Sequence, residues 1–236
     1  MAITRLGIGA IAAGILACNL MGCADSAPVS EVPTPKPTET PALSPAPTEA
    51  VPSDPITPPT VTWIEPLPEA ELWARLQQQD VPYFVLMRHA LAPGTGDPEG
   101  FQLEDCTTQR NLDEVGRLQA QRTGEAFVAQ GVTVDRVLSS QWCRCLDTAE
   151  LMALGTVEPF PPLNSFFSDR STEPEQTRQV LEFIGSQANQ PGVTVMVTHF
   201  VNVAAIGGSG VNSGEMVVLA LTEPDQVTVL GAIAPL

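Results

Sequence analysis

The stretch Tyr83-Phe84-Val85-Leu86-Met87-Arg88-His89-Ala90 decides the fold class. The apolar run 83–87 predicts a strand that is buried on both faces, as in a parallel sheet. The strand ends at Arg88 and His89, and residues 91–96 have the Gly and Pro composition of a loop. Because open α/β sheets bind ligands at the carboxyl ends of their strands, this strand end is a candidate site.

A second stretch, Val193-Thr194-Val195-Met196-Val197-Thr198-His199, has the same design of a buried run that ends at a histidine. The chain contains only 2 histidines, and both lie at these strand ends. We therefore predict that His89 and His199 belong to one site.

The remaining pattern alternates strands and helices, which predicts an α/β layered domain. A helix starting at Asn111 or Asp113 carries Gly116, Ala120 and Gly124 on one face, a stripe that predicts close packing on a sheet. The other predicted elements are helices near 68–76, 141–154 and 172–188, and strands at 134–139, 215–221 and 226–233.

Composition excludes one class of partner. The 236 residues include 11 Lys and Arg against 27 Asp and Glu, a net charge of -16. Without a basic stripe the chain cannot neutralise a phosphate backbone, so we expect no nucleic-acid partner.

The first 61 residues predict export. Residues 1–23 have the charged start, short apolar core and small residues of a signal peptide. Leu20-Met21-Gly22-Cys23 resembles the lipobox of bacterial lipoproteins, which implies a lipid anchor on Cys23, with Cys18 or an unlipidated signal as alternatives. Residues 24–61 are rich in Pro, Thr and Ser and predict a disordered tether. Residues 62–236 are then the folded domain, expected to be a monomer outside the cytoplasm.

Four motifs in this order resemble the histidine phosphatase superfamily, also called phosphoglycerate mutase-like. They cover residues 83 to about 221, and are Leu86-Met87-Arg88-His89-Ala90, the helix segment 111–120, the segment Ser139-Ser140-Gln141-Trp142-Cys143-Arg144 with Thr148-Ala149, and Val197-Thr198-His199. The resemblance implies a three-layer α/β/α sandwich with a mostly parallel sheet. It also implies a phosphatase that acts on a small phosphorylated substrate without a cofactor.

The chemistry of the matched residues agrees with that expectation. Phosphoryl transfer needs cations around the transferred oxygens and a nucleophile in line with the leaving oxygen. Arg88 and Arg144 supply forked donors, His199 a further donor, and His89 the nucleophile of a phosphohistidine intermediate. No metal is expected, because two histidines are too few for common zinc sites. Arg110 is expected on the surface, with a third phosphate contact as the alternative.

The general acid is the least determined residue. By chain position the sequence favours Asp169, with Glu173, Glu215 and Asp105 as alternatives. The chain also departs from the family pattern at Ala90 and Phe200, where glycine is usual or common. We expect these larger side chains to reshape the rim of the pocket.

Three cysteines lie outside the signal peptide. Cys106 is expected to pair with Cys143 or Cys145, which would join the first loop to the helix of Arg144. Position 145 matches a small buried residue of the family pattern, so Cys143 is the preferred partner. Three free thiols are the alternative.

The sequence thus predicts an exported, membrane-anchored histidine phosphatase. A non-catalytic lipoprotein that binds phosphorylated ligands is the alternative from another class. A mutase of sugar acids is not expected, because its substrates are cytosolic and this chain carries an export signal.

Overall fold

The computed structural model describes residues 58–236, so the predicted signal peptide, Cys18, Cys23 and most of the tether lie outside the described residues. The strands are β1 (Thr60–Trp63), β2 (Pro82–Arg88), β3 (Arg136–Ser139), β4 (Val157–Pro159), β5 (Gly192–Thr198), β6 (Met216–Glu223) and β7 (Gln226–Ile233). The α-helices are α1 (Glu69–Gln78), α2 (Glu114–Ala129), α3 (Cys143–Met152), α4 (Glu173–Ser186) and α5 (Phe200–Gly207). None of the helices in this part of the chain is long and apolar enough to cross a membrane.

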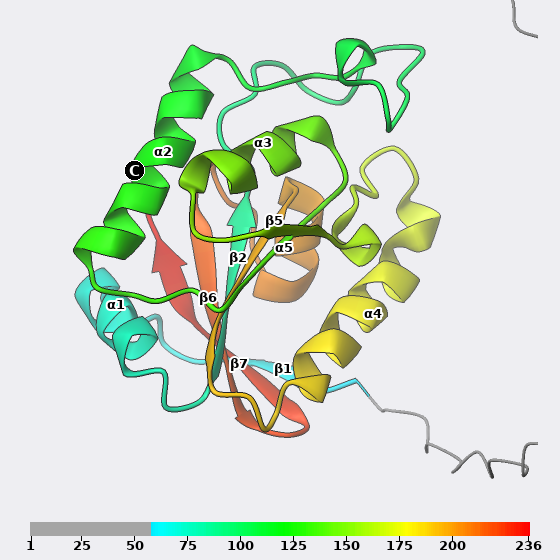
Figure 1. Ribbon diagram of the computed structural model, residues 1–236. Helices are drawn as coiled ribbons and strands as arrows, with labels where there is room; N and C mark the ends of the chain where they lie inside the picture. The colour runs from blue at the N-terminus through cyan, green and yellow to red at the C-terminus, as the bar shows by residue number, and fades with distance from the viewer. Residues whose placement is uncertain (1–57) are drawn as a thin grey trace, which may run out of the picture. The chain divides into compact units, whose positions relative to one another are not determined.

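One seven-stranded sheet organises the domain, in the order β1-β7-β6-β2-β5-β3-β4 (Figure 1). Four of the six neighbouring pairs are parallel, and the pairs of β6 with β2 and β7 are antiparallel. The predicted, mostly parallel sheet is therefore confirmed. The histidine strands β2 and β5 are direct parallel neighbours, with Arg88 opposite Thr198 in the register.

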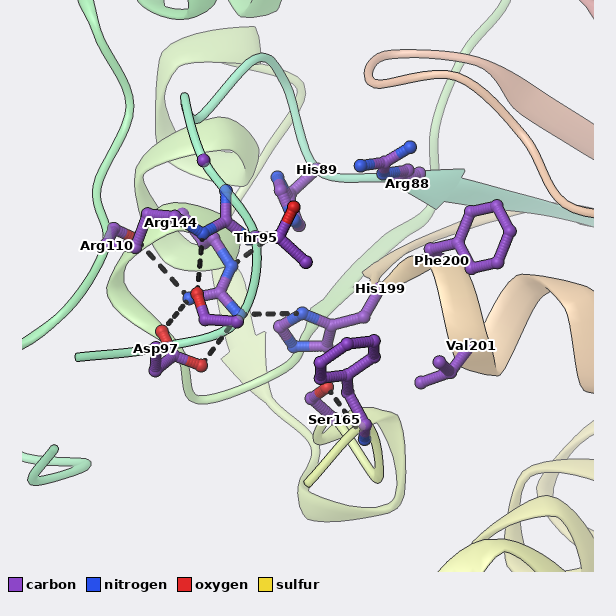
Figure 2. A pocket seen from close by; sticks show the side chains of 13 residues that line it. Arg88, His89, Thr95, Asp97, Arg110, Arg144, Ser165, His199, Phe200 and Val201 are labelled. Atoms are coloured by element: carbon purple, nitrogen blue, oxygen red, sulfur yellow. Dashed lines mark hydrogen bonds and ion pairs between the residues drawn. The ribbon is translucent and has the colours of Figure 1, made fainter. Parts of the chain in front are cut away.

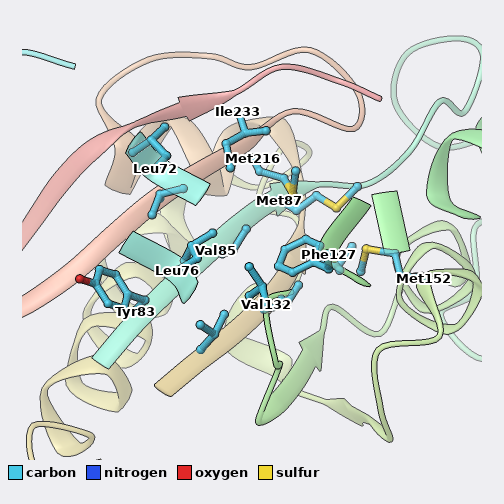
Figure 3. Packing of buried hydrophobic residues seen from close by; sticks show 14 of the residues in the cluster. Leu72, Leu76, Tyr83, Val85, Met87, Phe127, Val132, Met152, Met216 and Ile233 are labelled. Atoms are coloured by element: carbon cyan, nitrogen blue, oxygen red, sulfur yellow. The ribbon is translucent and has the colours of Figure 1, made fainter. Parts of the chain in front are cut away.

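Helices cover both faces of the sheet, which confirms the three layers. Side chains of α1, α2 and α3 pack with one set of β2 residues, which includes Val85 and Met87, as Figure 3 shows. Side chains of α4 and α5 pack with the other set, Phe84 and Leu86. Full burial of each large apolar side chain contributes about 1.5–3 kcal/mol. Because successive β2 side chains enter opposite layers, the strand needs the continuous apolar run seen in the sequence.

The small residues of α2 have a partner that differs from the predicted sheet. A Cβ at Gly116 would lie 1.9 Å from the carbonyl oxygen of Leu91, and one at Gly124 would lie 1.9 Å from that of Met152. The missing side chains of Gly116 and Gly124 thus let the backbone of the loop after β2 and of the end of α3 pack directly against α2. Asp113, not Asn111, caps α2 by accepting a hydrogen bond from the Gly116 amide.

Two short strands were not predicted. β1 begins at Thr60 and pairs with β7, so the folded part starts before the predicted boundary at residue 62. β1 and β4 contain no fully buried residue. Their hydrophobic pattern is therefore weak, and they form through hydrogen bonds to a neighbouring strand.

Candidate active site

The carboxyl ends of β2 and β5 bring the two histidines together, as the sequence predicts. The His89 amide donates to the Thr198 carbonyl over 2.9 Å, and the centroids of the two imidazole rings are 5.5 Å apart. Both side chains are buried. Figure 2 shows His89 and His199 on adjoining walls of one cavity, with Arg144 between them.

His89 presents an unprotonated nitrogen to this cavity. Its Nδ1 lies 2.8 Å from the carbonyl oxygen of Ala90, and because a carbonyl only accepts, Nδ1 carries the proton. Nε2 therefore keeps its lone pair and accepts from Arg144 Nε over 3.2 Å. Burial, followed by the charge of Arg144, lowers the pKa of His89 to about 3. The ring is neutral at physiological pH, as a nucleophile must be.

In His199 the proton is on the other ring nitrogen. Its Nε2 lies 2.8 Å from Ser140 Oγ, and that hydroxyl donates onward to Asn164 Oδ1. Nε2 therefore carries the proton, and Nδ1 faces Arg144 Nη2 at 3.4 Å. Burial and the neighbouring His89 and Arg144 lower the pKa of His199 well below its ordinary value. His199 is thus a neutral member of the cluster.

Arg144 is the centre of the arrangement. It is the second residue of α3 and is 2% exposed. Besides both histidines, its guanidinium binds Asp97 through two hydrogen bonds, Nη1 to Oδ1 at 2.6 Å and Nη2 to Oδ2 at 3.2 Å. A buried, forked donor set of this kind matches the oxygens of a phosphate.

Arg88 offers a donor without a partner. Its Nη1 donates to the carbonyl of Val211 over 2.8 Å, whereas its Nε is buried and makes no hydrogen bond within residues 58–236. A buried unpaired donor costs about 1–3 kcal/mol. The same residue lines the cavity.

The loop between β2 and α2 adds two residues that sequence reasoning placed elsewhere or missed. Arg110 lines the cavity, which corrects the expected surface position, and its guanidinium donates to the carbonyls of Gly96 and Ala92. Asp97 also lines the cavity. Its neighbours in the sequence indicate only a turn, and no signal there shows that the side chain points inward.

The favoured acid of the sequence lies outside the cavity. Asp169 is exposed, and its Oδ1 accepts from the Ser171 amide at the start of a short 3₁₀ turn, η3 (Arg170–Thr172). Its assignment as the acid therefore has no support from the geometry.

The three alternatives also lie outside the cavity and bind neighbours close in sequence. These pairs are Glu173 with Arg170, Glu215 with Asn212, and Asp105 with Thr107.

The cavity has a volume of about 300 Å³ and two chemically different sides. Asp97, Arg110 and Arg144 lie together at one side, while Phe200 and Val201 lie at the other, where the Arg88 guanidinium is 5.4 Å from the centroid of the Phe200 ring. Phe167 also lines the cavity. Phe200 is 45% exposed at the rim, as its departure from the family pattern predicts. Ala90 does not line the cavity, and its φ lies outside the left-handed region, so alanine fits there without strain.

A disulfide joins Cys106 to Cys143, which is the preferred pairing from the sequence, with 5.7 Å between the Cα atoms. It attaches the loop to α3 one residue before Arg144. Next to it, Gln109 Oε1 accepts from the Cys143 amide over 3.0 Å. Cys145 is buried and forms no disulfide with the other described cysteines, and burial raises the pKa of its thiol to about 12.

Comparison with known proteins supports the predicted family. Residues 84–164 match the model of the histidine phosphatase superfamily (branch 1), a stretch that contains His89 and Arg144. No curated protein matches the chain in sequence.

Two solved structures share the fold. The chain is similar to the protein histidine phosphatase SixA complexed with tungstate, with a TM-score of 0.51, 16% identity, and coverage of 65% of this chain and 97% of that one. It is also similar to the phosphoserine phosphatase of Entamoeba histolytica in complex with 3-phosphoglyceric acid, with a TM-score of 0.50, 13% identity, and coverage of 65% and 97%. These likenesses show the phosphoglycerate mutase-like fold that the sequence predicts.

Proposed function

We propose that this chain is a histidine phosphatase that hydrolyses a phosphomonoester through a phosphohistidine on His89. The observation that carries the proposal is that the unprotonated Nε2 of His89 lies 3.2 Å from Nε of the buried guanidinium of Arg144. A phosphoryl group bound by Arg144 would lie next to the nucleophile. The family match over residues 84–164 and the fold support the same reaction.

The cavity residues divide the chemistry as follows. Arg144 and Arg88 bind the equatorial oxygens of the phosphoryl group, with Arg110 as a third cation in the wall. His199 directs a ring nitrogen into the same cluster. His89 Nε2 attacks phosphorus as the ester oxygen leaves, and water then hydrolyses the phosphohistidine. We propose no metal, because the guanidinium groups stabilise the charge that develops on phosphorus.

The apolar side of the cavity favours a substrate with an apolar part. Phe167 and Phe200 are about half exposed beside the phosphate cluster, so an aromatic or aliphatic leaving group can rest on them. An aryl phosphate is therefore a suitable first substrate.

Turnover tests this proposal. The full-length protein is assayed with 4-nitrophenyl phosphate, in the presence and absence of a chelator, beside a His89→Ala variant. We expect metal-independent hydrolysis that falls at least about 10³-fold in the variant. Equal activity of the two proteins would contradict the proposal.

The second candidate is a phospholigand-binding protein without catalysis. It is favoured by one observation, that all four carboxylates predicted as the acid lie outside the cavity. Binding of inorganic phosphate together with an absence of turnover on aryl and alkyl phosphates would select this function.

We also propose that the protein works outside the cytoplasm, attached to a membrane through a lipid on Cys23. The disulfide Cys106–Cys143 supports an oxidising compartment. Incorporation of labelled fatty acid that is lost in Cys23→Ser but kept in Cys18→Ser tests the anchor. Label that survives Cys23→Ser and disappears in Cys18→Ser would move the anchor to Cys18.

A further inference from the structure

Asp97 lines the cavity but has no role in the reaction proposed above. Of the described residues that line the cavity, it alone has a carboxylate. Its side chain is 14% exposed. It lies in a loop segment held by Arg110, which donates to the Gly96 and Ala92 carbonyls on the N-terminal side of Asp97. The backbone is therefore anchored, and the carboxylate is fixed mainly by its own hydrogen bonds.

Those hydrogen bonds occupy the donors that a phosphate would need. Both terminal nitrogens of Arg144 bind Asp97, and Trp142 Nε1 donates to Oδ2 over 3.0 Å. The third nitrogen of the same guanidinium, Nε, binds the nucleophile His89. A phosphoryl group that takes the forked face of Arg144 must therefore displace Asp97 while it stays next to His89.

We propose that Asp97 has two roles in the reaction cycle, an inference that rests on the proposed function. In the free protein its carboxylate binds both terminal nitrogens of Arg144 and occupies the place of a phosphate. With substrate bound, the displaced carboxyl group is the general acid that protonates the leaving oxygen.

The local charges make this exchange reasonable. In the free protein burial alone would raise the pKa of Asp97, but the hydrogen bonds and charge of Arg144, with help from Trp142 and Arg110, hold it below its ordinary value. A phosphate dianion that replaces Asp97 on Arg144 removes the largest of these stabilising contacts and adds a negative neighbour. Both changes favour the protonated carboxyl that a general acid needs.

The steps balance. The bond between His89 Nε2 and phosphorus forms as the ester P–O bond breaks, and the leaving oxygen takes the proton of Asp97. In the second step water attacks phosphorus, Asp97 takes a proton from it, and the N–P bond breaks. The products are one alcohol and one phosphate for each water consumed, and His89 is regenerated. Asp97 takes its proton from solvent when substrate displaces it, and returns that proton to solvent when phosphate leaves and the carboxylate binds Arg144 again.

The test compares two esters that differ in their need for an acid. Nitrophenolate leaves without a proton, whereas an alkoxide does not, so loss of the acid affects the alkyl ester selectively. We would measure kcat/KM of the wild type and of Asp97→Asn for 4-nitrophenyl phosphate and for a phenylalkyl phosphate. Inhibition by inorganic phosphate is measured in the same proteins. Asp147→Asn is the matched control. Asp147 lies on α3, the helix of Arg144, but its ion pair is an outer one with Arg117 of α2.

We expect Asp97→Asn to lower kcat/KM about 100-fold for the alkyl ester and less than about 3-fold for the nitrophenyl ester. Its phosphate inhibition constant should fall about tenfold, because the competing carboxylate is gone. Asp147→Asn should resemble the wild type. Asp97→Ser, which also removes the charge, should repeat the Asp97→Asn pattern if its unfolding transition remains cooperative.

Equal losses on both esters combined with weaker phosphate inhibition would overturn the inference, because Asp97 would then only position Arg144. Selective loss of the alkyl ester in Asp169→Asn instead would also overturn it. A wild type that hydrolyses neither ester would contradict the proposed function itself, which separates the two failures.

Discussion

Two loops border the cavity, residues 91–110 and 164–172, and they contain the same local turn. Asp105 caps the 3₁₀ turn η1 (Cys106–Thr108) by accepting from the Thr107 amide, and Asp169 caps η3 by accepting from the Ser171 amide. Asp169 is exposed and Asp105 is partly exposed, and each carboxylate also accepts from the hydroxyl two residues on, Ser171 or Thr107. Local sequence chemistry therefore makes the two loops look alike.

Their attachment to the rest of the domain differs. The first loop is joined to α3 by the Cys106–Cys143 disulfide and held internally by Arg110, and it places Asp97 on Arg144. The second is fixed at Asn164, which binds Ser140 and Gln141, whereas its segment 168–172 is exposed. Long-range attachment, more than chain position, therefore decides which loop brings a carboxylate into the site.

The two loops should differ most in how much activity is lost when one arginine of each is replaced. Arg110→Met loses a cavity cation and the donor to two loop carbonyls, and we expect kcat/KM to fall about 10²–10³-fold. Arg170→Met on the other loop loses an exposed ion pair with Glu173 and should stay within about twofold. Steady-state kinetics on 4-nitrophenyl phosphate measures both variants. Similar losses in the two would contradict the contrast between the loops.

Removing the disulfide tests the same contrast through stability. The double variant Cys106→Ser with Cys143→Ser opens a crosslink between residues 37 apart, and we expect the free energy of unfolding to fall by about 3 kcal/mol. Activity should fall about tenfold at a temperature where the variant is folded, because Asp97 and Arg110 are then held less firmly. Urea unfolding and kinetics on the same sample measure the two effects. Unchanged kcat/KM in the folded variant would show that Arg110 and Gln109 alone hold the loop.

Much of the fold was predictable because its strongest signals are local. The β2 and β5 runs, the Asp113 cap and the helix stripes each need only a few adjacent residues to be recognised. β1 and β4 were not predicted, because strands without buried residues have no clear hydrophobic pattern and form only by pairing with other strands.

The candidate site divides in the same way. Arg88, His89, Arg144 and His199 lie at the ends or starts of regular elements, so the topology brings them together. Asp97 and Arg110 lie in an irregular loop, and their direction depends on a disulfide and on hydrogen bonds between residues far apart. Chain position alone favoured Asp169, whose side chain lies exposed outside the cavity.

Acid titration of stability should separate the buried histidines from the loop caps. The pKa of His89 is lowered to about 3 and that of His199 is also lowered, in both cases chiefly by burial. The charges of Arg88, Arg110 and Arg144 lower both pKa values further. In the unfolded chain both histidines titrate near about 6.5. Between pH 6.5 and 4.5 the unfolded state therefore binds more protons, and stability falls with decreasing pH by about 1.4 kcal/mol per unit for each histidine.

Urea unfolding at several pH values checks this slope, with His89→Gln as the comparison. That variant should lose about half of the pH dependence. The caps Asp105 and Asp169 contribute below this window, because their hydrogen bonds lower their pKa values. A slope that His89→Gln leaves unaltered would contradict the assignment of a neutral His89.

The smallest expected effect concerns the contribution of the second loop. Phe167 lines the cavity and is 49% exposed. Phe167→Ala should raise KM for an aryl phosphate about threefold and leave kcat within error, because only leaving-group contact is lost. Leu118→Ala, at an exposed position of α2, is the control. A fall in kcat larger than the rise in KM would assign this loop a part in the chemistry.

The most direct test of the central claim is to trap the phosphoenzyme. Full-length protein is mixed with a ³²P-labelled ester, quenched within milliseconds, and assayed for protein-bound label. We predict a bond that is labile in acid and stable in base, located by peptide mapping on His89 and missing from His89→Asn. Label that persists in His89→Asn, or rapid turnover by that variant, would contradict the assignment of His89 as the nucleophile.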